Sequence, residues 1–219
     1  MSISENIENL GGNVISKGQN ALNFLEFLKK CLKAIFSGSF ITNRAAFDVL
    51  VMQIYFTAYE LLPLFIFISA VYGSIFIGIV LQTVKSLGLV QYLGDIIMGL
   101  VVLEMAPLIT VFLLALRSSS AVNAEIAVMK ANRELDSLVS FRIDPVTYLF
   151  VPRIISFIIS VTTLSAIFSI VVLFSGFIFS SIIFEMSAGI YADLLARSVS
   201  IWDLLIMLFK SVLFGFLIS

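Results

Sequence analysis

Two charged residues lie inside otherwise apolar stretches of the sequence, where they could bind or neutralise a polar group within a membrane. Glu104 falls near the centre of the apolar stretch 96–116, where an ionised carboxylate costs at least ~2.5 kcal/mol. Its side chain is therefore expected to face protein or water rather than lipid tails. Lys210 lies within a second apolar stretch, 204–219. It can pair with Glu104, or its amine can snorkel to the membrane surface, and the sequence leaves both open.

Several classes of chemistry are not expected. The chain has no histidine and one cysteine, Cys31, so the usual metal ligand, proton shuttle and disulfide framework are missing. A phosphate-binding G-x-x-x-x-G-K-[ST] loop is also missing. A net charge of −1 argues against nucleic acid as a partner. We expect no enzyme activity and no cofactor on this chain, so that any ATP would be used by another subunit.

The composition indicates that the chain is embedded in a lipid bilayer. Of its 219 residues, 60% are hydrophobic and 12% are charged, which is too apolar for a soluble domain of this length. The predicted fold class is an all-α polytopic membrane bundle.

Four apolar stretches should cross or enter the membrane. The first three are each long enough to cross a ~30 Å hydrocarbon core as a helix, whereas the last would reach only ~24 Å and looks like a truncated span. Pro107 predicts a kink in the second. The third exceeds the bilayer thickness, so it should tilt, break near Gly176 or place an extra piece in the headgroup region. The stretches are residues 61–84, 96–116, 154–184 and 204–219.

Basic residues predict the orientation. Lysines and arginines concentrate before the first span and in the 117–153 loop, while the connections near Gln91 and Asp193 carry few. By the positive-inside rule the N-terminus and the 117–153 loop are cytoplasmic.

Two segments before the first span are amphipathic or apolar without being long enough to span alone. Residues 21–36 and 45–59 are both expected to lie at the membrane interface. The predicted organisation is a cytoplasmic and interfacial segment, 1–59, followed by a transmembrane domain, 60–219. Small residues in the first span, paired at 69/73, 70/74 and 74/78, favour close helix packing within a bundle or a dimer.

The 117–153 loop is too regular to be a simple connection. Val122, Ile126 and Met129 recur at helical spacing, and charged residues occupy the remaining positions. Asp144 followed by Pro145 predicts a helix N-cap and a first-turn proline. Such a helix can dock a partner protein or pack against its own bundle, and composition favours neither.

Short motifs in order along the chain resemble the MlaE permease family, the membrane subunits of Mce/Mla-type ABC transporters that move phospholipids or other lipids. The motifs are Glu104-Met105-Ala106-Pro107, Leu108-Ile109-Thr110 with Arg117, Ala124-Glu125-Ile126 with Met129-Lys130, Glu134-Leu135-Asp136-Ser137-Leu138, Ile143-Asp144-Pro145 and Val151-Pro152-Arg153. The resemblance extends over about residues 44–219, with Lys210-Ser211 similar to a pair in the family's fourth span.

The resemblance implies a complex in the bacterial inner membrane. Two copies of the permease would form a homodimer, a separate ABC ATPase would bind ATP and dock on the 117–153 loop, and an Mce-domain lipid-binding protein would sit outside. Glu104, Pro107 and Lys210 would line the lipid cavity. The residues implied in ATPase coupling are Glu125, Lys130, Arg133, Glu134, Asp136, Arg142 and Asp144.

Two other functions remain open from the sequence. An ion-coupled secondary transporter or channel could use Glu104 as its coupling site, and a membrane scaffold would transport nothing. Flux without an ATPase would favour the transporter or channel, whereas lipid phenotypes insensitive to loss of Glu104 would favour the scaffold.

Overall fold

The computed structural model describes most of the chain, and within the described part every regular element is a helix. This confirms the predicted all-α class. The described residues are 19, 22, 25–26, 28–35, 44–183 and 186–219.

The elements include several π-helical segments, labelled η, in which the helix is locally wider than an α-helix. The first part of the chain forms α3 (Arg44–Ile54), η1 (Tyr55–Tyr59), α4 (Leu62–Ser86), the 3-10 helix η2 (Val90–Tyr92), α5 (Leu93–Ile97), η3 (Met98–Met105), α6 (Ala106–Leu114) and η4 (Ala115–Ser119). The second part forms α7 (Ser120–Ala131), α8 (Glu134–Ser140), η5 (Val146–Phe150), α9 (Val151–Ile183), α10 (Ala188–Ser198) and α11 (Ile201–Ile218).

Among the described residues, four continuous helices are long and apolar enough to cross a membrane. Each ends close to the end of its predicted span but begins earlier, and the first and third include residues predicted to precede the span. Within the first of these helices, η1 ends at Tyr59 and α4 begins at Leu62, with a turn between them near the predicted boundary at residue 60. The four helices are Phe47–Ser86, Val90–Arg117, Val146–Ile183 and Ile201–Ile218.

Glycines let the first and third spans pack closely. A Cβ added at Gly176 would lie 2.1 Å from the Cδ1 of Ile77, and one at Gly73 would lie 2.3 Å from the Oγ of Ser175. Helix α9 runs unbroken through Gly176, which excludes a break there, one of the three alternatives for this stretch. Ser69 and Gly73 of the small-residue pattern are buried in this chain's own bundle.

The last helix begins earlier than its apolar stretch. Ser200 accepts a hydrogen bond from the Trp202 N–H (3.3 Å), and the Asp203 carboxylate accepts one from the Ser200 N–H (3.2 Å). This capping box starts α11 at Ile201. The helix has 18 residues, or ~27 Å, and is longer than the predicted truncated span.

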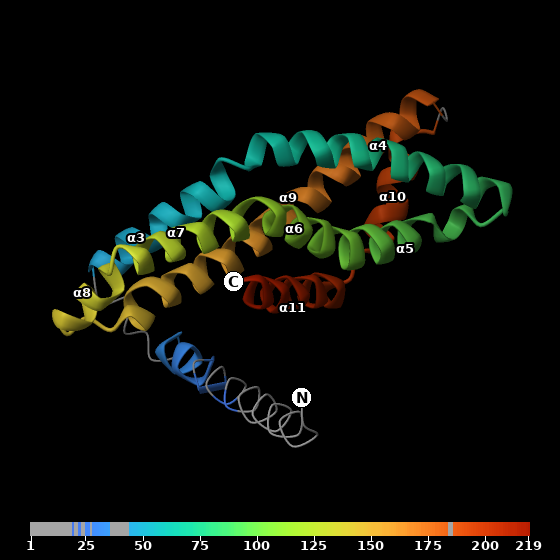
Figure 1. Cartoon of the computed structure of the whole chain (residues 1–219). Helices are drawn as coiled ribbons and strands as arrows, with labels where there is room; N and C mark the ends of the chain where they lie inside the picture. Colours follow the sequence, from blue (N-terminus) through green and yellow to red (C-terminus); the bar gives the residue numbers. More distant parts are fainter. Residues whose placement is uncertain (1–18, 20–21, 23–24, 27, 36–43, 184–185) are drawn as a thin grey trace, which may run out of the picture.

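Helix α9 runs through the middle of the bundle, where it packs against α3, α4, α6 and α11 (Figure 1). Helices α7 and α8 lie at one end of the bundle, and α10 with the turn between α4 and α5 lies towards the other. The 117–153 loop is thus an ordered helical element, as predicted. The core between α4, α6 and α9 contains buried Phe65, Leu114, Leu164 and Phe168.

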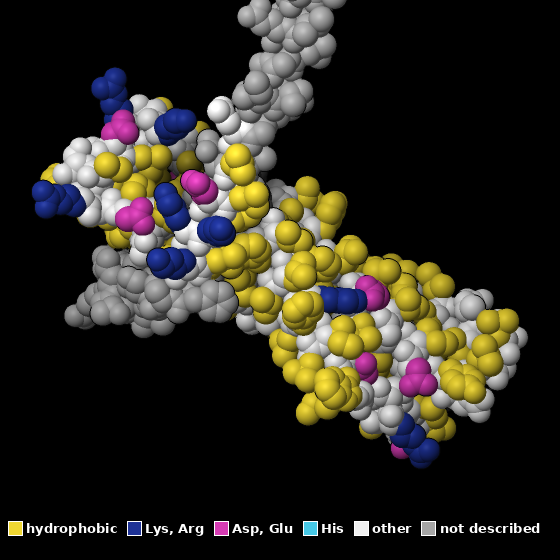
Figure 2. Space-filling model, turned by 90° about the horizontal axis from the view of Figure 1, so that it is seen from below, with side chains coloured by type: hydrophobic (Ala, Val, Ile, Leu, Met, Phe, Trp, Pro, Cys, Tyr) yellow, Lys and Arg dark blue, Asp and Glu magenta, His cyan; other side chains and the backbone are white. Residues whose placement is uncertain are grey.

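The outer surface is largely apolar. Figure 2 shows hydrophobic side chains over the middle of the molecule, with a group of charged side chains at one end and others over the middle and the opposite end. Exposed residues such as Phe67, Phe112 and Ile170 would cost free energy in water but suit contact with lipid. The surface is that of a membrane protein.

The segment predicted at 21–36 is described only in part. Residues 28–35 are helical, and Ala34 and Ile35 pack with Leu50 and Val151 of α3 and α9. The remainder of this prediction lies partly outside the described residues. The interfacial positions of 21–36 and 45–59 stay predictions.

Candidate functional site

The two charged residues of the apolar spans meet each other. The Nζ of Lys210, on α11, forms an ion pair with the Oε1 of Glu104 in η3. The same Nζ donates a hydrogen bond to the carbonyl of Leu103 at 3.3 Å. Of the two alternatives for Lys210, the structure therefore places its amine against Glu104.

Pro107 follows Glu104 closely in the chain. Because a proline has no N–H, the carbonyl of Leu103, four residues earlier, has no α-helical donor. The Lys210 ammonium donates to that carbonyl. Glu104 and Leu103 lie in the π-helical segment η3, and Pro107 is buried in the first turn of α6. Glu104 and Lys210 thus meet, whereas Pro107 is buried in α6, and the prediction that the three line a lipid cavity stays a prediction.

The ion pair lies on the surface of the single chain. The Glu104 side chain is 59% exposed and that of Lys210 is 31% exposed. Exposed Leu100 and Leu108 lie nearby in sequence. A charged pair on an apolar transmembrane surface is stable only against another protein surface, a polar headgroup or water. The arrangement can bind a zwitterionic or charged headgroup, since it offers both signs of charge.

A second polar cluster lines a cavity of about 610 Å³ at the end of the bundle that carries α7. Arg117 of η4 pairs with Glu60, N–O distance 3.3 Å, and Arg153 of α9 pairs with Glu125 of α7. The other lining residues are mainly apolar. They are Val49, Met52, Gln53, Phe56, Thr57, Ala121, Met129, Tyr148, Leu149, Ser156 and Phe157.

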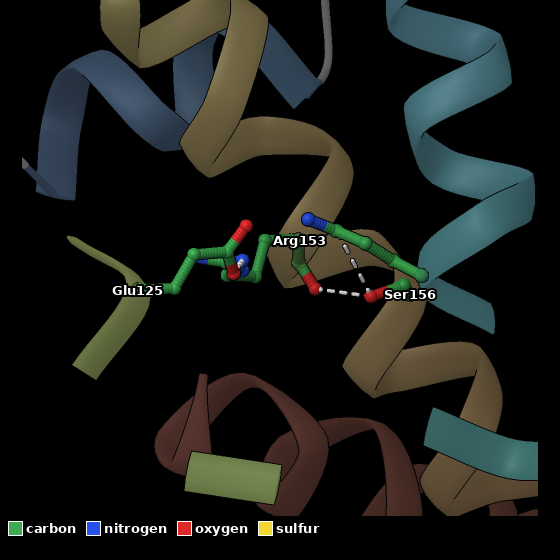
Figure 3. A network of polar contacts seen from close by, with 4 residues as sticks. Glu125, Arg153 and Ser156 are labelled. Carbon is green, nitrogen blue, oxygen red and sulfur yellow. Dashed lines mark hydrogen bonds and ion pairs between the residues drawn. The ribbon is translucent and has the colours of Figure 1, made fainter. Parts of the chain in front are cut away.

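Arg153 is the buried member of this cluster, and Figure 3 shows it beside Glu125 and Ser156. The residue is 8% exposed, whereas the side chain of its partner Glu125 is 58% exposed. The Oγ of Ser156 donates to the Arg153 carbonyl at 2.8 Å and to the Oε1 of Gln53 at 3.5 Å. These contacts connect the loop helix α7 to α9 and α3.

The residues predicted for ATPase coupling fall into two groups. Glu125 is engaged by Arg153 at the cavity. Lys130, at the end of α7, and Asp136, on α8, are exposed. Glu134 is also exposed, and its Oε1 accepts a hydrogen bond from the Asn132 Nδ2 at 3.2 Å.

Arg133 and Arg142 occupy the turns on either side of α8. Their φ angles are 58° and 61°, in the left-handed region that only glycine and, less often, asparagine adopt readily. Both side chains are exposed. The α8 segment is thus set apart by two strained turns, a feature that helical periodicity did not predict.

Asp144 caps the helix that leads into the third span, as predicted. Its carboxylate accepts hydrogen bonds from the N–H groups of Val146 and Thr147, both at 3.3 Å, and from the Thr147 hydroxyl at 2.7 Å. Burial raises the pKa of this carboxyl, but the hydrogen bonds and nearby Lys30 outweigh it and hold the pKa below its ordinary value. Its role in ATPase coupling stays a prediction.

Sequence reasoning assigned no role to Glu60, Gln53, Arg117 or Arg153 at the α7 cavity. Arg117 and Arg153 did stand out in the motifs of the resemblance. Glu60 and Gln53 carried no such signal, because their contacts join segments more than fifty positions apart. The π-helical segments that border the cavity also have no simple sequence signature.

Comparisons with known proteins give a consistent picture. The family model described as Permease MlaE matches residues 50–219. A probable ABC transporter permease protein of Synechocystis sp. is 34% identical to this chain over 116 residues, which cover 53% of this chain and 44% of that protein. The protein TRIGALACTOSYLDIACYLGLYCEROL 1, chloroplastic, of Arabidopsis thaliana is 30% identical over 133 residues, 61% of this chain and 38% of that protein.

A third relative covers more of both chains. The intermembrane phospholipid transport system permease protein MlaE of Haemophilus influenzae is 30% identical over 178 residues, 78% of this chain and 66% of the relative. The matches to the first two relatives span less than half of those proteins' own length.

Proposed function

Because this chain belongs to the MlaE permease family, we propose that it is the membrane subunit of an ABC transporter that moves phospholipid or a related lipid. ATP is bound and hydrolysed by a separate ATPase subunit, and this chain supplies the transmembrane path. The observation that carries the proposal is the Lys210–Glu104 pair between two apolar helices. It provides both signs of charge for a headgroup beside apolar surface for the acyl chains.

The lipid path follows from that site. A phospholipid headgroup contains an anionic phosphate and often a cationic amine, so Lys210 and Glu104 can each bind one part of it. Exposed Phe112 and Leu108 on α6 give the acyl chains an apolar surface. The hydrogen bond from the Lys210 ammonium to the Leu103 carbonyl would position the ammonium.

A second copy of the chain would complete the cavity. The ion pair is too exposed on one chain to face lipid tails without a large cost. In a homodimer, the two Glu104–Lys210 sites would share an enclosed space between the subunits. An Mce-domain protein on the outer side of the inner membrane would exchange lipid with this space, and the N-terminus and α7–α8 would be cytoplasmic.

The loop helices would couple ATP hydrolysis to this cavity. An ATPase docked on α8 would move α7, which is joined to α9 through the Glu125–Arg153 ion pair. Helix α9 packs against α4, α6 and α11, and α11 carries Lys210. A displacement of the loop can therefore reach the lipid site through packed helices and one ion pair.

Co-purification tests the proposal. The chain, affinity-tagged in its native membrane and extracted in detergent, should yield an ATPase subunit in stoichiometric amount. Charge reversal at Glu134 and Asp136 should reduce that yield severalfold, because both are exposed on α8. Asp193→Lys, on α10 towards the other end, is the matched control and should leave the yield unchanged. Recovery without an ATPase contradicts the proposal.

An ion-coupled secondary transporter or channel is the other candidate. It has less support, because a family model described as Permease MlaE and relatives named as ABC transporter permeases match this chain. Lipid or ion flux driven by an ion gradient without any ATPase would favour that function.

A further inference from the structure

The cavity beside α7 has no part in the proposed lipid path, and it has the volume and lining of a ligand site. Its volume is about 610 Å³, within the range of small-molecule sites. Met52, Phe56, Leu149 and Phe157 give it apolar walls, and its charged lining residues are Glu60, Arg117, Glu125 and Arg153. This lining suits a mainly aliphatic ligand with a polar end at the charged groups.

Three of the helices around the cavity depart from α-helical geometry where they border it. Phe56 and Thr57 lie in η1, Arg117 in η4, and Tyr148 with Leu149 in η5. Each π-helical turn costs regular hydrogen bonding and is found frequently at functional sites. Their occurrence together around one cavity indicates that these helices are shaped around an occupant.

Arg153 has unused hydrogen-bonding capacity. A guanidinium has five N–H donors, and this one is 8% exposed. Its ion pair with Glu125 uses one terminal nitrogen, and its Nε has no hydrogen-bond partner within the described part of the chain. A buried cation with an unsatisfied donor costs free energy, so an acceptor oxygen from a ligand would be stabilised there.

The partner of Arg153 can give way to such a ligand. The Glu125 side chain is 58% exposed and can be hydrated when it leaves the guanidinium, whereas Arg153 stays buried. An oxyanion entering the cavity would replace Glu125 or share the guanidinium with it. Arg117, the other arginine of the lining, pairs with Glu60 at 3.3 Å.

We propose that this cavity binds an anionic amphiphile, with the aliphatic chain against Met52, Phe56 and Phe157 and the oxyanion on Arg153. A free fatty acid and an anionic phospholipid share this chemistry. The inference does not rest on lipid transport through the Glu104–Lys210 site, since it concerns a separate cavity in the same chain.

Native mass spectrometry of the full chain in detergent tests the site. The protein is titrated with oleate, with dioleoyl phosphatidylglycerol and with uncharged dioleoylglycerol. We expect one of the two anions to bind at least ~tenfold more tightly than dioleoylglycerol, the ratio for one charge-assisted hydrogen bond. Preference for oleate identifies a fatty acid as the ligand, and preference for phosphatidylglycerol identifies a phospholipid. Equal binding of dioleoylglycerol overturns the proposal.

Two variants locate the ligand. Glu125→Gln removes the carboxylate that competes for Arg153, so the preferred anion should bind several-fold more tightly, whereas a purely structural ion pair would give no gain. Met129→Trp fills the cavity from α7 and should weaken binding ~tenfold. Val128→Trp, on the neighbouring exposed position outside the cavity, is the matched control. Equal binding by the two tryptophan variants overturns the assignment.

Discussion

The ammonium of Lys210 forms an ion pair with the carboxylate of Glu104 and donates to the Leu103 carbonyl at 3.3 Å. This contact joins α11 to η3, so that the second and fourth spanning helices share one charged site. Its partners lie more than a hundred positions apart, and the site exists only in the folded bundle.

Removing one member of this pair should destabilise the chain more than removing both. Lys210→Met or Glu104→Gln leaves one charge without its partner, at a cost of at least ~2.5 kcal/mol in apolar surroundings, or a fall in Tm of ~5 °C or more. The double variant should recover part of that loss, because no uncompensated charge remains. Thermal unfolding in nanodiscs measures the difference.

Arg197→Met is the control for that experiment. It breaks the Asp193–Arg197 pair, whose side chains are 58% and 77% exposed, and exposed pairs contribute ~1 kcal/mol or less. If Lys210→Met lowers the Tm no more than Arg197→Met does, the Lys210–Glu104 pair stabilises the bundle no more than an exposed ion pair.

Substitution of Gly73 should disrupt the packing of α4 on α9. A Cβ there would lie 2.3 Å from the Ser175 Oγ and 2.8 Å from the Val172 Cα, so Gly73→Val forces the helices apart at a cost of ~1–3 kcal/mol. Gly99→Val is the matched control, because nothing lies within 4 Å of the added Cβ. Thermal unfolding of both variants in detergent checks this, and equal stability would contradict the close approach.

The lowered pKa of Asp144 predicts how the stability of the protein depends on pH. Its folded-state pKa lies below the ordinary 3.8, so its contribution to stability is fully present above pH ~3.8 and is lost as the pH falls through the folded-state value. Asp144→Ala should therefore cost ~1 kcal/mol at pH 7 and at pH 5. The difference between wild type and variant should close only below pH ~3.8. Thermal unfolding across this range measures it, and a difference that vanishes by pH 5 would contradict the capping role.

Glycine variants of Arg133 and Arg142 distinguish strain in the backbone from a function of the side chains. Their positive φ angles of 58° and 61° are easier for glycine, so glycine at either position should raise stability by up to ~1 kcal/mol. If the side chains also contact the ATPase, the same variants should lower ATPase co-purification severalfold. A variant that is more stable and still binds the ATPase fully would remove that arginine from the coupling surface.

The spans and the loop helices could be predicted because hydropathy, basic residues and caps are local signals. Glu104 stood out for the same reason, as a charge in an apolar run. The apolar stretch predicts a later start for α11 because Asp203 is charged, whereas the Ser200–Asp203 capping box starts the helix at Ile201. The α7 cavity could not be predicted, because it depends on π-helical turns and on the Glu125–Arg153 and Glu60–Arg117 contacts, which form only when distant segments pack.

The most direct measurement of the central claim is lipid movement in proteoliposomes that contain the chain with its co-purified ATPase. A fluorescent phospholipid should move on addition of ATP and Mg²⁺ with all ion gradients dissipated, and Glu104→Gln with Lys210→Met should abolish that movement while the ATPase remains bound. Lipid movement that ignores ATP, or that persists unchanged in the double variant, would contradict the account.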